Sequence, residues 1–392
     1  MKDVYIVSGV RTAIGGFGGS LKDVPPATLG SVTAREAISR AGVAAEEIEH
    51  AFYGQVIPTT PADGYLSRVI AIDAGLPQES PALTVNRLCG SGLQAIVSAA
   101  QSLQLGDCTM ALAGGAESMS RAPFHVPTQR WGRKLGDATL VDALNGALTD
   151  PFNRVLMGVT AENVANRYGI SREQQDQAAI ESHRRAAAAI ADGRFVGQIV
   201  PIRIGKRGRE TEFRVDEHVR PDVSLGDLAA LRPVFAEAGS VTAGNASGIN
   251  DGAASVVMAI GSTVERRGLS PLARLVSYAH AGVDPMYMGT GPIPATRKAL
   301  AKAGLSIDQI DVIESNEAFA AQACAVSQEL GLDPDKVNPN GSGISLGHPV
   351  GATGAIITVK LIHELQRIGG RYGLVTMCIG GGQGIAAIFE KC

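Results

Sequence analysis

The chain contains 392 residues, of which 45% are hydrophobic and 19% are charged, so it can bury a large core and is not an intrinsically disordered protein. The formal net charge of −3 argues against a protein that binds nucleic acid by neutralising phosphates, and aromatic residues, at 4%, are too few for a base-stacking platform. The five cysteines are too few, and odd in number, for a disulfide framework. We therefore expect a cytoplasmic protein with neither a signal peptide nor a membrane span.

An internal repeat predicts that the fold is duplicated. Residues 35–43 (REAISRAGV) match residues 297–305 (RKALAKAGL) at an offset of 262, and residues 109–115 (TMALAGG) resemble residues 376–382 (TMCIGGG) at an offset of 267. Two matches in the same order, at nearly one spacing, favour duplication over chance. Each half should then be an α/β unit.

The expected elements of the first half begin with a strand at residues 4–7. Apolar residues at helical spacing then predict a helix over 93–103, which Gly106 can end in the left-handed conformation. A buried strand over 109–113 should follow and stop at the Gly114–Gly115 pair.

The second half repeats this order, with a strand over 311–314, a helix over 352–362 and a strand over 374–379. Alternation of this kind predicts mostly parallel sheets with helices packed on their faces.

Between the halves, residues 119–249 break the pattern. They include the only tryptophan, Trp131, and a basic stretch between Arg203 and Arg220, which indicates an insertion with a binding or assembly role. A strand over 253–260 should then complete the first half. The expected organisation is an N-terminal half at 1–118, completed by about 250–270, an inserted loop domain at 119–249 and a C-terminal half at 271–392.

Cys89 is the first candidate for chemistry, within residues 86–92 (NRLCGSG). It directly precedes the predicted helix, and a helix N-terminus is expected to lower the pKa of a thiol and so favour a nucleophile. The alternative is a small buried residue before a glycine turn. Gly90, Gly92 and Ala95 also fit a dinucleotide-binding fingerprint, but weakly, because the strand before them is interrupted and no acidic residue stands at the required spacing.

His348 lies in a similar glycine-rich entry to a helix, residues 345–354 (SLGHPVGATG), 259 positions after Cys89. The two residues are therefore expected at equivalent places in the two halves, where the imidazole could take the proton of the thiol. The alternative is a polar residue in a Gly/Pro turn.

Two further residues have both a structural and a functional interpretation. Cys378 ends a strand before a glycine run, 380–382, whose amide groups could hold an oxyanion; the alternative is a core residue before a tight turn. Asn316, or Ser315, is either an N-cap of the next helix or part of an oxyanion site. A zinc site is not expected, because no paired cysteine or histidine spacing occurs.

Taken together, these segments resemble the thiolase family over the whole chain. The motifs that carry the resemblance are NRLCGSG (86–92), AGGAESM (113–119), TAGNASG (242–248), NEAF (316–319), GHP (347–349) and CIGGG (378–382), in the family's order. The likeness is greatest to bacterial β-ketothiolases of short-chain and polyhydroxyalkanoate-precursor metabolism. It implies an α/β protein with the duplicated, five-layered α/β/α/β/α thiolase fold.

The resemblance also implies roles for the candidate residues. Cys89 would be the acylated nucleophile, His348 its activating base, and Cys378 the base that exchanges the α-proton of acetyl-CoA. Asn316, through a water molecule, and His348 would form one oxyanion site, and the amides of Cys89 and Gly380 the other. The implied activity is the reversible condensation of acetyl-CoA with acetyl-CoA or a short acyl-CoA; the alternatives are a catalytically silent acyl-CoA-binding subunit and a thioesterase.

Coenzyme A is implied as a substrate and not as a permanently bound cofactor. Leu156 stands where many short-chain members have histidine, so a polar contact to the pantetheine is not expected there. The family also suggests a homotetramer, a dimer of dimers, joined by residues near 120–140. The residues expected to contact coenzyme A or the acyl group are Arg220, Ser247, Met157, Phe235, Ala243, Ala318, Phe319 and Met288.

Overall fold

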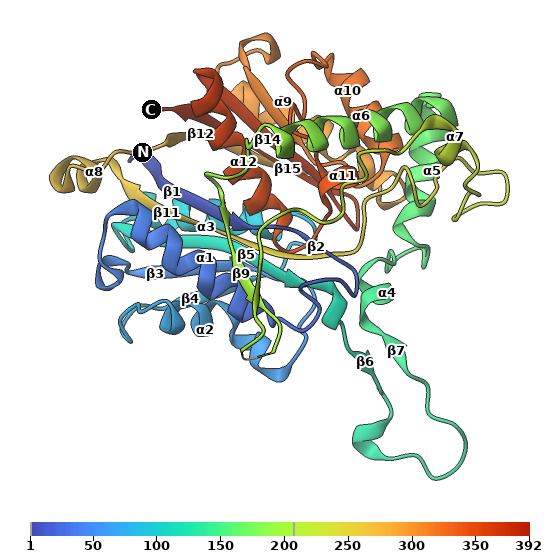
Figure 1. The fold of residues 1–392 in the computed structure, drawn as a ribbon, viewed down its shortest axis with the longest axis horizontal. Coiled ribbons are helices and arrows are strands. Elements are labelled where there is room, and N and C mark those ends of the chain that lie inside the picture. Colours follow the sequence, from blue (N-terminus) through green and yellow to red (C-terminus); the bar gives the residue numbers. More distant parts are fainter. Residues whose placement is uncertain (1, 207) are drawn as a thin grey trace.

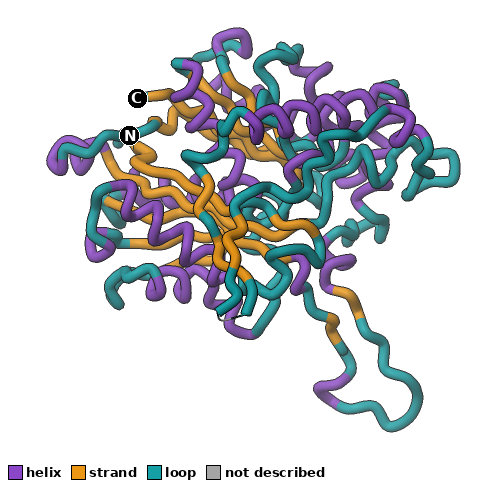
Figure 2. Tube along the Cα trace, viewed as in Figure 1, coloured by secondary structure: helices purple, strands orange, loops and turns teal. Residues whose placement is uncertain are grey.

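The computed structural model describes residues 2–206 and 208–392, and it shows one continuous mixed β-sheet (Figures 1 and 2). Its two halves, called the first and the second sheet below, are joined through a short pairing of their edge strands. In the first half the strand order is β4 (Ala82–Val85), β3 (His50–Gly54), β5 (Met110–Ser118), β11 (Asn250–Ile260) and β1 (Val4–Thr12). In the second half it is β12 (Ala273–Gly282), β15 (Gln383–Lys391), β14 (Tyr372–Ile379) and β13 (Val312–Ser315). Only two residue pairs, Tyr5 with Arg274 and Ile6 with Ala273, join β1 to β12.

Helices form three layers around these sheets, which gives the five layers α/β/α/β/α that the resemblance implied. The central layer is α3 (Ser91–Leu105) packed against α12 (Thr353–Ile368). On the outer face of the first sheet lie α1 (Pro26–Ala41) and α2 (Leu66–Asp73), and on that of the second lies α9 (Pro292–Ala303). The remaining helices outside the insertion are α8 (Gly261–Arg267), α10 (Ala320–Leu330) and α11 (Gly343–Leu346).

The two central helices touch because glycines remove side chains at the contact. A Cβ atom on Gly92 would lie 2.7 Å from the amide nitrogen of Ala355, and one on Gly354 would lie 2.4 Å from that of Leu93. Both helices end at a glycine in the left-handed conformation, Gly106 with φ 91° and Gly369 with φ 70°. The predicted helices, the duplication and the glycine stop of the first helix are therefore confirmed.

The elements β3, β5 and α3 recur in the second half as β13, β14 and α12 at an offset of 262 residues, whereas β11 and β15 begin 133 residues apart. α12 begins at residue 353 and α3 at 91, and β14 begins at 372 and β5 at 110. The register agrees, because Tyr53 pairs with Gly114 in the first half and Ser315 with Thr376 in the second. The offset of 267 that aligned residues 109–115 with 376–382 is therefore wrong by five residues.

Two expectations about the strands are wrong. The sheets are mixed and not mostly parallel, because β11 and β15 insert antiparallel between the parallel strands, and β15 returns from β14 through a tight glycine hairpin. The strand predicted to stop at Gly114 and Gly115 instead continues to Ser118 as β5. Gly114 instead lets neighbouring backbone come close to β5, because a Cβ atom on it would lie 2.2 Å from the Ala254 carbonyl oxygen of β11.

The segment between Met119 and Asn250 leaves the two sheets and covers one end of them. It begins with an extended arm, whose short strands β6 and β7 pair, and continues in helices that pack beside the second half (Figure 1). A fully buried ion pair anchors its far end, because Arg11 of β1 binds Asp216 with both nitrogens, at 2.7 and 2.9 Å. The elements are β6 (Phe124–His125), β7 (Val141–Asp142), α4 (Ala143–Ala147), α5 (Met157–Tyr168), α6 (Arg172–Ala191), β8 (Ile199–Val200), β9 (Ile202–Ile204), β10 (Thr211–Phe213) and α7 (Leu225–Ala229).

None of the helices in residues 2–206 and 208–392 has both the length and the apolar composition required to cross a bilayer.

Candidate active site

Cys89 lies in a tight turn between β4 and the start of α3. The residue before it, Leu88, has φ 47°, a left-handed conformation that costs a side-chain-bearing residue about 1–2 kcal/mol. Hydrogen bonds hold the turn: Leu88 N–H donates to the Asn86 side chain at 2.9 Å, and the Ser91 hydroxyl donates to the Leu88 carbonyl at 2.6 Å. The strained turn thus places Cys89 immediately before the first residues of the helix.

The surroundings of the Cys89 thiol are drier than the sequence suggests. Although the residue keeps partial exposure, the groups packed around its sulfur exclude water, and this desolvation raises the pKa of Cys89 to about 11. The amide groups of Gly380 and of Cys89 itself act in the opposite direction, because they donate hydrogen bonds to the sulfur. Nearby amides therefore lower the pKa of Cys89 as expected, but desolvation outweighs them and the net shift is upward.

His348 is buried at the loop between α11 and α12, and its imidazole is fixed from both sides. Nδ1 lies 2.7 Å from the Thr353 hydroxyl, which itself donates to the Pro349 carbonyl oxygen at 2.9 Å. Since that hydroxyl has given its hydrogen away, it accepts from Nδ1–H, and Nε2 is left as the acceptor that faces the Asn316 amide. Burial lowers the pKa of His348 to about 4, so the imidazole is neutral at physiological pH and can accept a proton.

Asn316 follows β13 and faces this imidazole, with its Nδ2 atom 3.4 Å from His348 Nε2. The residue is fully buried, and its Oδ1 atom has no hydrogen-bond partner among the described residues. The N-cap interpretation of Asn316 or Ser315 is wrong, because the next helix, α10, begins only at Ala320 and Phe319 occupies its N-cap position. Asn316 is thus free to act in the site.

Cys378 lies near the end of β14, fully buried, and its thiol is close enough to Cys89 for the charge of one to raise the pKa of the other. Desolvation is the larger cause of the strong rise in the pKa of Cys378. The following residues, 380–382, form the hairpin to β15, and Gly381 and Gly382 have φ 77° and 80°. The glycine run is therefore both a tight turn and the source of the Gly380 amide.

A cavity of about 410 Å³ opens beside these groups. Its lining includes His348 and the predicted contact residues Met157, Phe235, Ala243, Ser247 and Phe319, together with Leu156. Met288 and Ala318 lie in one apolar cluster with Met157, Phe319 and Cys378, next to the cavity. Arg220 is exposed on the loop that follows Asp216, outside the cavity lining, and its amide donates to His183.

Several lining residues were not predicted from the sequence. They come from four separate segments, and apolar side chains predominate, which is a pattern that no local motif signals. The cavity also contains Met119, Asn145, Leu148, Gly158, Val234, Thr242, Ala246, Gly248, Ile249 and Val350.

Glu117 is a second residue that the sequence did not single out. It is fully buried at the end of β5, and its carboxylate accepts hydrogen bonds from the amides of Val56, Ile57 and Gly351, at 2.9, 3.2 and 2.9 Å. Desolvation raises its pKa to about 8, against the effect of these three donors. It ties the loop after His348 to the first half.

The constant offset of 262 changes the expected relation between Cys89 and His348. The residue equivalent to Cys89 is Gly351, and the residue equivalent to His348 is Asn86, because the two helices start at 91 and 353. The expectation that thiol and imidazole occupy equivalent positions is therefore wrong by three residues. Both residues nevertheless enter the site from the loops that precede the paired central helices.

Comparison with known proteins matches residues 4–262 to the thiolase N-terminal domain and residues 269–391 to the thiolase C-terminal domain. The chain is 65% identical over 391 residues to "Beta-ketothiolase BktB" of Cupriavidus necator, covering 100% of this chain and 99% of that protein. It is 48% identical to an acetyl-CoA acetyltransferase of the same organism, with full coverage of both.

Solved structures agree. The chain superposes with a TM-score of 0.98 on the acetyl-CoA acetyltransferase of Bacillus anthracis, which is 47% identical, over 100% of this chain and 99% of that one. With human mitochondrial 3-ketoacyl-CoA thiolase in complex with CoA the TM-score is 0.97 at 44% identity, over 100% and 98% of the two chains. Since both domains match and the relatives align over their full length, the chain belongs to the thiolase family.

Proposed function

We propose that this protein is a β-ketothiolase that condenses acetyl-CoA with acetyl-CoA or a short acyl-CoA and cleaves 3-ketoacyl-CoA in reverse. The observation that carries the proposal is that Cys89, Cys378 and the Gly380 amide lie together, next to an apolar cavity that the neutral His348 imidazole lines. Met157 joins the two sites, because it packs with Cys378 and lines the same cavity. A thiol to hold the acyl group and a second base for a weakly acidic α-proton are what a Claisen condensation requires.

In the first step, His348 Nε2 takes the proton of the Cys89 thiol, and the sulfur attacks the thioester carbonyl. The bond from the acyl carbon to the sulfur of coenzyme A breaks, and the leaving thiolate takes the proton back from His348. Because the Gly380 and Cys89 amides donate toward the Cys89 sulfur, they are placed to stabilise the oxyanion of the tetrahedral intermediate that forms on it.

In the second step, the Cys378 thiol gives its proton to His348 Nε2, and the resulting thiolate takes the α-proton of a second acetyl-CoA. The enolate attacks the carbonyl carbon of the acyl-Cys89, and a carbon–carbon bond forms. The bond to the Cys89 sulfur then breaks, and the Cys89 thiolate takes the proton from His348 Nε2. Asn316 and the His348 imidazole lie within 3.4 Å of each other and would hold the enolate oxygen, Asn316 through a water molecule. The two thiols and the imidazole titrate as a coupled set.

The substrate is an acyl-CoA, with coenzyme A itself consumed and released. We assign the pantetheine to the cavity and the acyl end to the apolar cluster of Met157, Met288 and Phe319. Leu156, with 38% of its surface exposed, presents an apolar wall to the same cavity, so the pantetheine makes no side-chain hydrogen bond there. Arg220 and Ser247 are assigned to coenzyme A as well.

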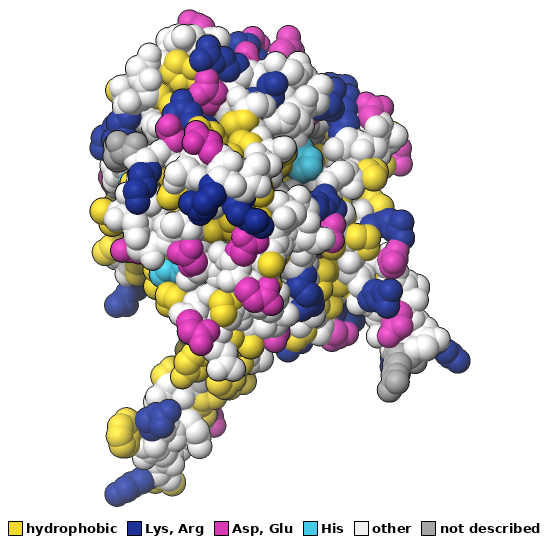
Figure 3. All heavy atoms as spheres, turned by 90° about the vertical axis from the view of Figure 1, so that its left-hand side faces the viewer, with side chains coloured by type: hydrophobic (Ala, Val, Ile, Leu, Met, Phe, Trp, Pro, Cys, Tyr) yellow, Lys and Arg dark blue, Asp and Glu magenta, His cyan; other side chains and the backbone are white. Residues whose placement is uncertain are grey.

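We also propose that residues 119–249 act as a loop domain for coenzyme A and for assembly into a homotetramer. The arm projects from the body at the lower left of Figure 3, where hydrophobic side chains are visible on its surface. Its exposed apolar side chains include Phe124, Trp131 and Leu135, at 61%, 89% and 90% exposure. Apolar surface of this extent is characteristic of an interface.

All five cysteines are free thiols, which supports the cytoplasm as the compartment.

The Cys378→Ala variant separates this function from its competitors. It should form acyl-Cys89 from acetyl-CoA and exchange labelled coenzyme A, but it should not produce acetoacetyl-CoA. Full condensation by this variant would refute the role of Cys378, whereas acyl-CoA hydrolysis without condensation by the wild type would favour a thioesterase. Rates of thiolysis across four- to ten-carbon 3-ketoacyl-CoA substrates then give the acyl length.

A further inference from the structure

The strand that presents Asn316 lacks a complete neighbour on its outer edge. In the first half, β4 pairs with β3 through four residue pairs, from Ala51 with Ala82 to Gly54 with Val85. In the second half, the corresponding partner of β13 is reduced to one bridge, between Ile313 and Val337. The chain then turns away at Pro339, which has no N–H to donate.

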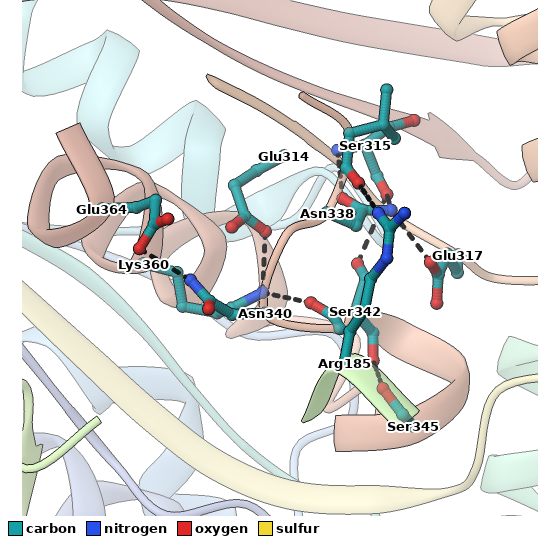
Figure 4. A network of polar contacts seen from close by, with 12 residues as sticks. Arg185, Glu314, Ser315, Glu317, Asn338, Asn340, Ser342, Ser345, Lys360 and Glu364 are labelled. Carbon is teal, nitrogen blue, oxygen red and sulfur yellow. Dashed lines mark hydrogen bonds and ion pairs between the residues drawn. The ribbon is translucent and has the colours of Figure 1, made fainter. Parts of the chain in front are cut away.

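The side chain of Asn338 replaces the missing backbone pairing. Its Oδ1 atom accepts from Ser315 N–H at 2.9 Å, and its Nδ2 atom donates to the Ser315 carbonyl oxygen at 2.8 Å. An amide side chain offers an acceptor oxygen and a donor N–H, as a strand backbone does. Asn338 therefore satisfies the hydrogen bonds of both the N–H and the carbonyl group of Ser315, the residue directly before Asn316. Figure 4 shows Asn338 lying against Ser315.

Asn338 also holds the residue on the other side of Asn316. The same Nδ2 atom donates to Glu317 Oε1 at 2.9 Å, and Glu317 Oε2 accepts from the Ser182 hydroxyl at 2.6 Å. Asn338 is only 4% exposed and has φ 46°, a conformation that asparagine tolerates better than most residues. Asn338 thus holds the Ser315 backbone before Asn316 and the Glu317 side chain after it, while the Nδ2 atom of Asn316 faces His348.

We propose that Asn338 is a positioning residue that sets the Asn316 side chain toward His348, and that it acts by completing the edge of β13. The inference rests on the proposed function, in which Asn316 and His348 hold the enolate oxygen. It predicts a selective defect. Loss of Asn338 should impair steps that pass through the enolate, and it should spare acylation of Cys89, which relies on the Gly380 and Cys89 amides.

The test compares Asn338→Asp with a matched control, Asn340→Asp. Asn340 is equally buried, at 3%, lies in the same loop and also donates its Nδ2 to a buried glutamate, Glu364, at 2.9 Å. It lies with Lys360 and Glu364 at the other end of the network from Ser315 (Figure 4). The two variants therefore make the same chemical change at similar depth, and only one changes the support of Asn316.

Asn338→Asp should lower condensation kcat and the exchange of deuterium from solvent into the acetyl group by about tenfold to a hundredfold, because small misplacements of a catalytic group have effects of this size. Exchange of labelled coenzyme A into acetyl-CoA should stay within about twofold of wild type in both variants. In an Asn316→Ala background, Asn338→Asp should add little further loss, since the group that it positions is absent.

Asn338→Gly provides a second route if the aspartate variant does not fold, because glycine accepts the left-handed backbone and removes the side chain. Equal loss of coenzyme A exchange and condensation, or unchanged deuterium exchange in both Asn338 variants, would overturn the inference. A wild-type protein that exchanges coenzyme A but never condenses would instead contradict the proposed function.

Discussion

The two halves place different residues at the same point of the fold, and this difference separates their tasks. At the end of β3 stands Gly54, and 262 positions later, at the end of β13, stands Asn316. A Cβ on Gly54 would lie 2.5 Å from the Ser91 carbonyl carbon and 2.8 Å from the Gly351 carbonyl oxygen, so this position lets the start of α3 approach. The first half uses the position for packing and the second half uses it for chemistry.

The interiors behind these positions also differ. The first half has Phe52 in β3, 2% exposed, and Ser98 in α3. The equivalent residues of the second half are Glu314 and Lys360, which form a fully buried ion pair at 2.7 Å. At these two positions a buried ion pair thus takes the place of a buried phenylalanine and a partly buried serine. Duplicated backbones therefore do not require duplicated interiors.

The largest expected effect comes from breaking that ion pair. Lys360→Met leaves the Glu314 carboxylate buried without its cation, which should lower the free energy of unfolding by about 3–5 kcal/mol. The double variant Glu314→Leu/Lys360→Met leaves both positions uncharged, as they are in the first half, and should recover most of the loss. Urea denaturation measures both, and a single variant as stable as the wild type would contradict the comparison.

The next prediction is that substitutions of Gly54 and Asn316 affect different properties, stability for Gly54 and activity for Asn316. Asn316→Ala should fold normally and lower condensation kcat by about 10²–10³-fold, equivalent to about 2.7–4 kcal/mol, because one oxyanion donor is lost. Gly54→Ala should instead destabilise the fold by about 1–3 kcal/mol through overpacking against α3. Thermal unfolding and steady-state kinetics, run on both variants, would contradict the assignment if Asn316→Ala were the unstable one.

The thiol and the imidazole should also differ in their response to pH. Burial raises the pKa of Cys89 to about 11, so its thiolate fraction at neutral pH is about a hundredfold below that of an ordinary thiol, and burial lowers the pKa of His348 to about 4. The rate of Cys89 alkylation by iodoacetamide, followed by peptide mass spectrometry, should therefore keep rising above pH 9. A plateau below pH 9 would show that the thiol is already ionised.

The smallest expected effect concerns a feature that the two halves share, the glycine that ends each central helix. Gly106 and Gly369 end the two central helices with φ 91° and 70°. Alanine at either position should cost about 1–2 kcal/mol, since a left-handed residue with a side chain is strained. Similar losses in thermal stability are expected, and an unaffected Gly369→Ala variant would remove the conformational argument, because no neighbour lies within 4 Å of that glycine.

Local signals predicted much of this molecule. The two central helices, their glycine ends and the loops that carry Cys89 and His348 follow from short stretches of sequence, and the predicted thiolase family and acyltransferase activity are confirmed by the comparisons. The N-cap interpretation of Asn316 failed because an extended loop to Ala320 separates it from the helix.

Contacts between distant segments escaped prediction. Gly114 looked like a strand end, yet its partner is the Ala254 carbonyl, 140 positions away in the chain. Glu117 and Asn338 act on backbone groups whose identity depends on the completed fold, at Gly351 and Ser315. Because a side chain's hydrogen-bond partner is set by tertiary structure, a single sequence offers no signal for it.

The proposed function depends on Cys89 carrying the acyl group. Incubation with radiolabelled acetyl-CoA, acid quenching and peptide mapping should place the acetyl group on the peptide that contains Cys89, in the wild type and in Cys378→Ala alike. A protein that condenses acetyl-CoA while Cys89 remains unmodified, or while another residue carries the label, would contradict it.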